Sequence, residues 1–248
     1  MGQFNSTSLS ASTTDSPDRL PANPEASHAV HSLLATANNN RTQEILLKPV
    51  FEAGSDAWLN GRKAFTATNI LSAQECISLI TTLEEIGFEK ALISVGPGKD
   101  ILDETYRKSQ RRIVDSVPLS EAIWERIKHL VPETVPSPAG LPMRVVGLNE
   151  RLRVLKYMPG DSFKPHRDST FSRGNEMSVF TVQLYLNDCE EGGATAMWGD
   201  GKSSDIKREA RCEAGNVAIF SHRIMHEGSE VMKGVKYTIR TEVMYSFQ

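Results

Sequence analysis

The hydrophobic and polar positions divide the chain into an unpatterned first part and a patterned remainder. Residues 1–27 are rich in Ser, Thr, Asn, Pro and Ala, and hold Phe4, Leu9 and Leu20 as their only large apolar residues after the initiator Met. Such a segment buries too little apolar surface to offset the entropy lost on ordering. We therefore expect a disordered tail over residues 1–45 and one folded domain over residues 46–248.

Two helices are predicted early in this domain. Ser72 and Glu75 have the spacing of a capping box. Apolar residues then recur at intervals of three or four, namely Cys76, Leu79, Ile80, Leu83 and Ile86, and Gly87 is placed to end the helix. A second helix is expected over residues 119–131, where one face carries Leu119, Ile123, Ile127 and Leu130.

After Pro142 the pattern changes to that of short strands. Six runs are rich in Val, Ile, Thr, Tyr and Phe: Arg144–Gly147, Leu152–Met158, Ser178–Leu186, Ala194–Trp198, Val217–Phe220 and Val235–Phe247. The last run alternates, so that Val235, Tyr237, Ile239, Thr241, Val243 and Tyr245 share one face and Lys236, Thr238, Arg240, Glu242 and Met244 the other. Helices followed by many strands predict a mainly β fold, a sandwich or barrel over about 145–247 with helices packed outside.

Composition narrows the class of protein. The 248 residues are 39% hydrophobic and 24% charged, which is typical of a globular domain. The net charge of −3 offers no basic footprint for a phosphate backbone, so a nucleic-acid partner is disfavoured. No apolar run is long enough to predict a transmembrane helix.

The cysteines and the N-terminus bear on location. Cys76, Cys189 and Cys212 are an odd number at irregular spacing, which fits neither a disulfide framework nor a zinc cluster and favours an intracellular, cytoplasmic protein. The start shows no secretory pattern. It does match the M-G-x-x-x-[ST] pattern of N-myristoylation at Gly2, although an unmodified flexible end explains the same residues.

The first candidate metal ligands are the H-x-D pair His166 and Asp168. Residues i and i+2 of a strand point to the same face, so an imidazole and a carboxylate could reach one metal ion. A second His from a distant strand would complete the two-His, one-carboxylate set of non-haem Fe(II) oxygenases, which leaves positions open for O2 and a 2-oxo acid. Taken alone, the pair also fits a surface His near a turn Asp.

A second segment supplies the missing groups. His226 follows Asp168 by 58 residues, and Lys236 lies ten residues further on. On a strand beside the metal strand, a buried Lys236 would require an anion such as a dianionic co-substrate. The alternative is an exposed lysine on an edge strand. His222 competes with His226 for the third ligand position, and Arg240 is a second candidate to hold the anion.

The motifs then resemble a known family. The pattern Y-x-x-G-x-x-F-x-x-H-x-D is present as Tyr157, Gly160, Phe163, His166 and Asp168, and H-x-x-x-x-V-x-x-G-x-K as His226, Val231, Gly234 and Lys236. Between them lie the segments 184–187 and 191–195, which are similar to the "YLN…GG-x-T" pattern. Over about 145–245 the chain thus resembles the prolyl-4-hydroxylase-like branch of the Fe(II)/2-oxoglutarate dioxygenases.

This resemblance implies a fold and a reaction. The fold would be a double-stranded β-helix, a jelly-roll or cupin-like barrel flanked by N-terminal α-helices. The catalytic iron ligands would be His166, Asp168 and His226. Lys236 would bind the C5 carboxylate of 2-oxoglutarate, with Tyr157 and Thr195 beside it. The reaction would convert 2-oxoglutarate and O2 to succinate and CO2 while hydroxylating a C–H bond of a protein side chain or small molecule, with ascorbate as the reductant.

Several features stay open at this point. Ala194 stands where the family pattern has an acid, and the polar insertion 198–210 interrupts the barrel; both bear on the substrate. The basic cluster Arg107, Lys108, Arg111 and Arg112 is either a solvated face or a substrate contact. We interpret His28, His31 and His129 as bystanders, and Cys189 and Cys212 as packed thiols. A cupin-type metal oxygenase without 2-oxoglutarate, or a catalytically silent barrel that binds a partner, are the alternative functions.

Overall fold

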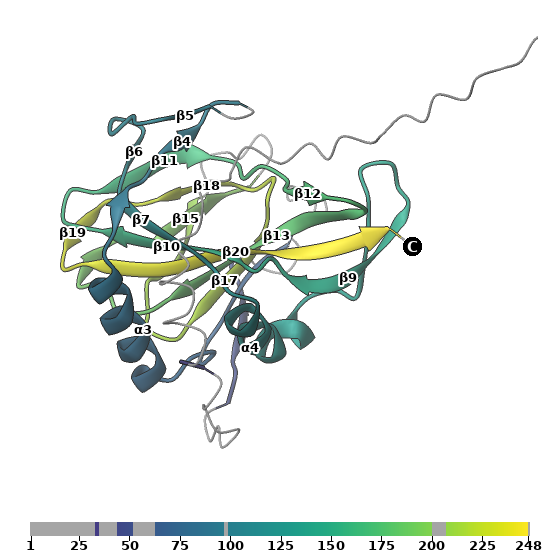
Figure 1. Ribbon diagram of the computed structural model, residues 1–248, viewed down its shortest axis with the longest axis horizontal. Helices are drawn as coiled ribbons and strands as arrows, with labels where there is room; N and C mark the ends of the chain where they lie inside the picture. The colour runs from purple at the N-terminus through teal and green to yellow at the C-terminus, as the bar shows by residue number, and fades with distance from the viewer. Residues whose placement is uncertain (1–32, 35–43, 52–62, 97–98, 200–206, 248) are drawn as a thin grey trace, which may run out of the picture.

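The computed structural model describes residues 33–34, 44–51, 63–96, 99–199 and 207–247, and Figure 1 shows two sheets facing each other with helices on one side. Most of the expected tail, including Gly2, His28 and His31, lies outside the described residues. Every strand pairing in the described part of the chain is antiparallel. This arrangement is the predicted jelly roll.

Local sequence signals place the first helix. Helix α3 spans Ala73–Ile86. The Ser72 hydroxyl accepts from the backbone N–H of Glu75, and the Glu75 carboxylate accepts from that of Ser72, which forms the predicted capping box. Gly87 ends the helix at φ +82°, a conformation that glycine adopts without steric cost. The predicted boundaries are confirmed.

The second helix begins earlier than its apolar pattern predicts. Helix α4 spans Val117–Ile127, and the 3₁₀ turn η1 continues it over Lys128–Leu130. Ser116 caps α4 through the backbone N–H of Leu119, and a proline occupies the first turn, where no N–H is needed. The prediction of 119–131 missed this cap because it relied on apolar periodicity alone.

The larger sheet has the order β1-β2-β17-β13-β20-β10-β7-β3, with β8, β9 and β12 attached at its side. Its strands are β1 (Leu47–Pro49), β2 (Ala64–Ala67), β3 (Glu89–Lys90), β7 (Gln110–Asp115), β8 (Thr134–Pro136), β9 (Pro142–Leu148), β10 (Arg151–Tyr157), β12 (Ser172–Arg173), β13 (Glu176–Tyr185), β17 (Val217–Ser221) and β20 (Lys236–Phe247).

The smaller sheet has the order β16-β15-β18-β11-β6. Its strands are β6 (Arg107–Lys108), β11 (Ser162–His166), β15 (Thr195–Trp198), β16 (Lys207–Ala210) and β18 (Met225–Gly228). Two short two-stranded sheets complete the fold, β4 (Ile93–Ser94) with β5 (Asp100–Ile101) and β14 (Glu191–Gly192) with β19 (Val231–Lys233).

Strand β20 divides the interior into an apolar and a polar side. Its residues Ile239, Val243 and Tyr245 join a hydrophobic cluster that also contains Leu79 of α3 and Ile123 of α4. The helices therefore cover the outer face of the larger sheet (Figure 1). The alternate residues of β20 face the smaller sheet, as the predicted alternation requires. This polar inner face is where a site can form.

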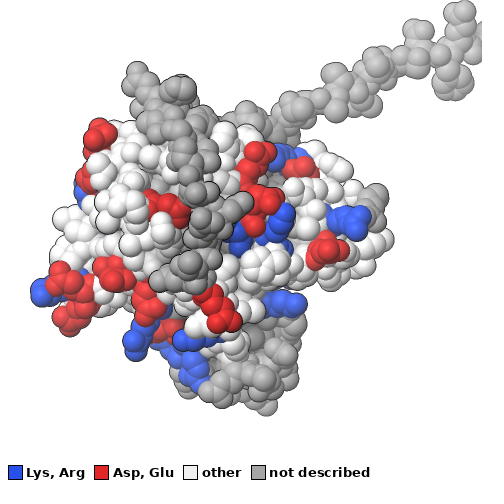
Figure 2. All heavy atoms as spheres, turned by 90° about the horizontal axis from the view of Figure 1, so that it is seen from below, with Lys and Arg blue, Asp and Glu red and all other residues white. Residues whose placement is uncertain are grey.

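The outer surface agrees with the overall charge. Figure 2 shows acidic and basic side chains interspersed among the described residues of one face, in keeping with the net charge of −3. In the described part of the chain, no helix is long and apolar enough to cross a membrane.

Candidate metal centre

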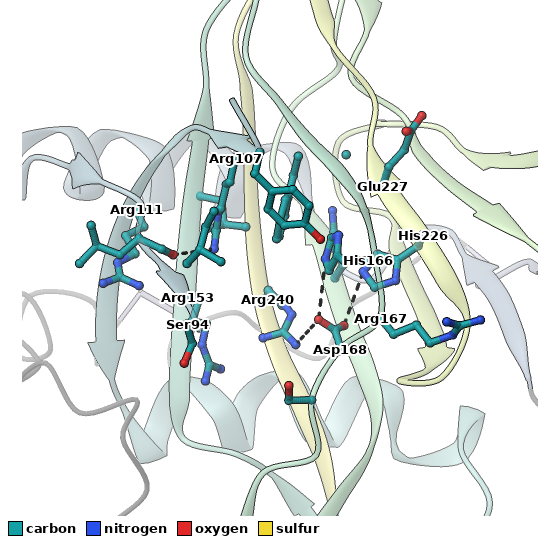
Figure 3. Close-up of a pocket in the computed structure, with 18 of the residues that line it drawn as sticks. Ser94, Arg107, Arg111, Arg153, His166, Arg167, Asp168, His226, Glu227 and Arg240 are labelled. Atoms are coloured by element: carbon teal, nitrogen blue, oxygen red, sulfur yellow. Dashed lines mark hydrogen bonds and ion pairs between the residues drawn. The ribbon is translucent and has the colours of Figure 1, made fainter. Parts of the chain in front are cut away.

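Three predicted residues meet between the two sheets. His166 ends β11 and lies directly opposite His226 of β18, while Asp168 follows β11 by two residues. One ligand atom from each side chain lies within 4.8 Å of the other two (Figure 3). The sequence placed Asp168 on the same strand as His166, but the strand ends at His166. The backbone N–H of Asp168 instead donates to the carbonyl oxygen of His222, which holds the carboxylate at the site.

Both imidazoles are oriented by the backbone. Nδ1 of His166 lies 2.8 Å from the carbonyl oxygen of Lys164, and Nδ1 of His226 lies 3.0 Å from that of Ile224. A carbonyl oxygen only accepts, so each Nδ1 carries the proton and each Nε2 keeps a lone pair. These Nε2 atoms lie 4.0 Å and 3.6 Å from the carboxylate oxygens of Asp168. The donor set therefore suits a divalent transition metal such as Fe(II).

The pKa shifts favour the protonation states that a metal ion needs. Burial raises the pKa of Asp168, but the charge of Arg240 and the neighbouring imidazoles outweigh it, so the carboxyl stays ionised. Burial and the proximity of His226 lower the pKa of His166 to about 3. Burial lowers the pKa of His226 as well. Two neutral imidazoles and one carboxylate are what metal ligation requires.

Two further side chains fix the Asp168 carboxylate. Arg240 Nη2 lies 2.8 Å from Oδ1, and the Thr181 hydroxyl lies 2.5 Å from Oδ2. Arg240 was a second candidate to hold an anion; here it is engaged with Asp168 and Glu242. The structure thus gives Arg240 a carboxylate-orienting position.

His222 lies near this cluster but outside it. Its Nδ1 lies 2.9 Å from the hydroxyl of Thr181, and its Nε2 lies 2.9 Å from that of Ser178. Both ring nitrogens are thereby engaged with hydroxyl groups, and His222 is 3% exposed. Burial lowers the pKa of His222 to about 4, so it is neutral at pH 7. Among the described residues, the group of side chains close enough to hold one metal ion contains His226 and not His222.

Lys236 is one of the most buried side chains in the described protein, at 1% exposure. Its ammonium lies 5.2 Å from the ring centre of Tyr157 and 5.8 Å from that of Tyr185. Burial lowers its pKa, and among the described residues no carboxylate lies within ion-pair distance. The sequence analysis predicted that the strand of Lys236 lies beside the strand that carries His166. That prediction was wrong, because β20 pairs with β10 and β13 in the opposite sheet. Lys236 lines the same cavity from across the barrel.

Thr195 and Tyr157 also line this cavity. The Thr195 oxygen accepts hydrogen bonds from Gln183 at 3.0 Å and from the Tyr185 hydroxyl at 2.8 Å. Because its oxygen is occupied as an acceptor, the Thr195 hydroxyl is left to donate its own proton. Tyr157 is 4% exposed, and burial raises its pKa, so its phenol is protonated.

The cavity has a volume of about 500 Å³ and contains polar residues that the sequence did not identify. Gln183 is one of them. The sequence also did not identify Thr181, whose hydroxyl is hydrogen-bonded to Asp168. A signal for both existed, since polar residues 181 and 183 alternate with apolar 180, 182 and 184 along β13.

Arg107, Arg111 and Arg153 line another wall of the cavity (Figure 3). A solvated face was one interpretation of the basic cluster, and for Arg111, which is 7% exposed, it was wrong.

The remaining singled-out residues lie away from the cluster. Ala194 is buried and is not among the cavity-lining residues. In the segment 198–210, residues 207–210 form β16 and pair with β15, while 200–206 lie outside the described residues. His129 is exposed in η1. Cys189 and Cys212 are free thiols, and burial raises the pKa of Cys212 to about 12, which makes it unreactive.

Comparison with known proteins gives a consistent result. Residues 152–241, which include all the residues of the cluster and Lys236, match the model of the 2OG-Fe(II) oxygenase superfamily. The chain is 28% identical over 166 residues to "Probable prolyl 4-hydroxylase 8" of Arabidopsis thaliana, covering 62% of this chain and 53% of that protein. It is 28% identical over 194 residues to "Prolyl 4-hydroxylase 1" of the same plant, covering 68% and 64%. The match thus spans less than two thirds of these relatives' lengths.

Solved structures share the fold. A prolyl-4-hydroxylase from Pseudomonas putida superposes with a TM-score of 0.52 at 15% identity, covering 77% of this chain and 97% of that one. A prolyl hydroxylase from Trichoplax adhaerens gives 0.50 at 12% identity, covering 89% and 90%. The two-sheet architecture around the cavity is therefore shared with these structures.

Proposed function

We propose that this chain is an Fe(II)- and 2-oxoglutarate-dependent dioxygenase of the 2OG-Fe(II) oxygenase superfamily, on its prolyl-4-hydroxylase-like branch, and that it hydroxylates a C–H bond. One observation carries the proposal. A cluster of two His and one Asp shares a single cavity with a buried lysine that no described carboxylate neutralises. A buried cation is costly without a counter-charge, so the cavity favours a dianionic co-substrate.

Each residue has a defined task in this proposal. His166, Asp168 and His226 would hold Fe(II) through their Nε2 and carboxylate atoms, already oriented by backbone carbonyls, Thr181 and Arg240. Bound iron would supply O2 activation, coupling the conversion of 2-oxoglutarate to succinate and CO2 with insertion of one oxygen atom into the substrate.

The wall around Lys236 would bind the co-substrate. Its ammonium would pair with the C5 carboxylate, and the hydroxyl groups of Thr195 and Tyr157 would donate to the same group. Lys236, Thr195 and Tyr157 are buried, and the low dielectric of a buried site would strengthen each of these interactions. Ascorbate would keep the iron reduced between turnovers.

The proposal also covers the class of substrate, the part of the chain that holds the activity and the cellular location. The named relatives point to a side chain such as prolyl in a protein, and a small molecule is the other class. We assign the activity to residues 46–248. The free thiols Cys76, Cys189 and Cys212 support an intracellular, cytoplasmic location, which a fluorescent fusion of the full chain would test.

The experiment measures iron-dependent binding of 2-oxoglutarate. Protein reconstituted with Fe(II) without oxygen should bind 2-oxoglutarate and give a charge-transfer absorption band. On admission of O2 with ascorbate, it should form succinate when offered panels of peptides and metabolites. Lys236→Ala should raise the KM for 2-oxoglutarate at least about tenfold, the scale of a lost charge-assisted hydrogen bond. Lys233→Ala is the matched control, since Lys233 is exposed and pairs with Glu190.

Two results would contradict the proposal. Absence of bound iron together with absence of the band would leave a catalytically silent barrel. Iron-dependent oxygenation that neither needs 2-oxoglutarate nor responds to Lys236→Ala would place the chain among cupin-type oxygenases.

A further inference from the structure

The basic cluster at 107–112 is divided between two environments. Arg107 of β6 and Arg111 of β7 line the cavity. Lys108 instead pairs with Asp161 at 3.1 Å, and Arg112 donates to the carbonyl oxygen of Gly87 at 2.6 Å, at the end of α3. Neighbouring residues of a strand point to opposite faces, which explains the division. Two of the four cations therefore face the proposed reaction site, and two have structural partners elsewhere.

Arg111 is buried with part of its hydrogen-bonding capacity unused. It is 7% exposed, and its Nε and Nη2 atoms have no hydrogen-bond partner among the described residues. Its nearest carboxylates, of Glu89 and Asp100, lie 3.8 Å and 3.7 Å away, too far for a hydrogen bond. A buried guanidinium with unmade hydrogen bonds is unfavourable unless a ligand completes them. Arg111 can therefore donate hydrogen bonds from Nε and Nη2 to a ligand that enters the cavity.

Arg107 adds a second guanidinium to the same wall. Its central carbon lies 4.7 Å from the ring centre of Phe163, and its N–H groups donate to the Ser109 hydroxyl at 3.3 Å and the Leu92 carbonyl at 3.4 Å. Among the described residues no carboxylate lies within ion-pair distance. Burial lowers its pKa, and so do the nearby charges of Arg111 and Arg240, against an opposing effect of Tyr157. Arg107 therefore has only neutral hydrogen-bond partners among the described residues, and the carboxylates near Arg111 lie beyond hydrogen-bond distance.

The lining of the cavity carries more cationic than acidic side chains. Six cationic side chains line it against four acidic ones: Arg107, Arg111, Arg153, Arg167, Lys236 and Arg240 against Asp100, Asp168, Glu227 and Glu242. Glu242 is shared by Arg153 and Arg240, and Glu227 pairs with Lys207. In the proposed enzyme, Fe(II) and the 2-oxoglutarate dianion balance each other. The excess positive charge then remains for the primary substrate.

We propose that Arg107 and Arg111 bind an oxyanion of the primary substrate, a carboxylate or a phosphate group. The planar guanidinium matches such groups bidentately. A neutral side chain would leave Arg107 without a counter-charge and Arg111 without a hydrogen-bonded one, so the inference narrows the substrate to an anionic one. It rests on the proposed function, because it takes Lys236 and not these arginines to hold 2-oxoglutarate.

The test measures anion binding without turnover. The full chain, loaded with Fe(II) and 2-oxoglutarate without oxygen, is titrated calorimetrically with inorganic phosphate and, separately, with acetate. We expect saturable binding of at least one anion; stronger binding of phosphate indicates a phosphorylated substrate, and stronger binding of acetate a carboxylate. Arg111→Gln and Arg107→Gln should each raise the Kd of that anion at least tenfold, and Arg111→Lys should restore part of the loss. Lys108→Gln is the matched control and should stay within twofold of wild type.

The affinity for 2-oxoglutarate is measured in the same variants. It should change less than twofold in Arg111→Gln, and a rise equal to that for the anion would overturn the inference by placing Arg111 in the co-substrate site. Unchanged anion affinity in the Gln variants, or no saturable binding to wild type, would overturn it as well. If Arg111→Gln fails to fold, Arg111→Lys and Arg107→Gln decide. Failure of the proposed function is distinguishable, because it appears as absent iron-dependent 2-oxoglutarate binding whatever the anion titration gives.

Discussion

The hydroxyl of Thr181 lies 2.5 Å from Oδ2 of Asp168 and connects this carboxylate to His222, whose Nδ1 lies 2.9 Å from the same hydroxyl oxygen. Because a carboxylate accepts, Thr181 donates to Asp168, and Nδ1–H of His222 donates to Thr181. Nε2 of His222 then accepts from the Ser178 hydroxyl. This chain of hydrogen bonds holds the carboxylate of Asp168 at Oδ2, while Arg240 holds it at Oδ1.

Thr181→Val should therefore weaken iron binding without removing a ligand. Valine keeps the shape of threonine and loses the hydrogen bond to Asp168, and loss of such an orienting partner typically costs about 10–100-fold in metal affinity. Competition with a chelator measures the Fe(II) affinity. Thr241→Val is the matched control, since Thr241 is also fully buried but donates to the Asn149 carbonyl. An equal loss of iron affinity in both variants would contradict the orienting role of Thr181.

Substitution of His226 and substitution of His222 should have different effects on the iron content of the protein. His226→Ala removes a proposed ligand and should abolish stoichiometric iron. His222→Gln should keep iron at one equivalent per chain, with affinity lowered by about tenfold through Thr181. Elemental analysis of protein reconstituted with Fe(II) decides between them. Retention of full iron by His226→Ala, with loss in His222→Gln, would reverse the assignment.

The sequence predicted features that depend on neighbouring residues. Helix α3 was predicted with its correct ends because Ser72, Glu75 and Gly87 act within a few residues of each other. The alternation of β20 was predicted because it is a local property of an extended chain. Motif spacing likewise identified His166, Asp168 and His226, which the fold brings together.

Features that depend on long-range pairing were missed. Lys236 was assigned to a strand beside the metal strands, because nothing near it in sequence shows that β20 pairs with β13 and β10. Strands β6 and β7 were not predicted, since their charged residues 107, 108, 111 and 112 resemble a solvated surface. Only the position of β7 beside β10, facing the barrel interior, makes Arg111 a cavity residue.

Lys236→Met should raise the stability of the protein without 2-oxoglutarate. Burial lowers the pKa of Lys236, so its protonated form destabilises the fold below the folded-state pKa, and this penalty is relieved as pH rises through that pKa. Methionine removes the charge and should stabilise by about 1–2 kcal/mol at pH 7, an advantage that shrinks toward pH 10.

Saturating 2-oxoglutarate should make the wild type more stable than Lys236→Met. At 100 times its Kd a ligand stabilises the folded state by about 2.7 kcal/mol. The iron-loaded wild type should gain this stability and Lys236→Met should gain little. Thermal melting with and without 2-oxoglutarate, in the absence of oxygen, measures both effects. An equal rise in Tm for the two proteins would show that Lys236 does not hold the co-substrate.

Gly215→Ala should destabilise the junction between the barrel and α3. Gly215 has φ +77°, and its carbonyl accepts from the backbone N–H groups of Ile70 and Leu71. A methyl group there would lie 2.2 Å from the Leu71 carbonyl oxygen. We expect a loss of more than about 2 kcal/mol, measured by urea unfolding. Gly140→Ala is the control, since φ is +82° but the added carbon meets nothing within 4 Å. It should lose only about 1–2 kcal/mol, and equal losses would mean that the clash at Gly215 relaxes.

Glu75→Gln should destabilise the protein at neutral pH and have little effect in acid. Burial raises the pKa of Glu75, but hydrogen bonds from Arg126 at 2.6 Å and from the backbone of Ser72 at 2.7 Å outweigh it, so the pKa is lowered. The stabilisation is present above the unfolded-state pKa of about 4.3 and is lost as pH falls through the lower folded-state pKa. Urea unfolding should show a deficit of about 1 kcal/mol at pH 7 that narrows toward pH 3.5. A deficit that does not change with pH would mean that the Glu75 charge contributes nothing to the cap.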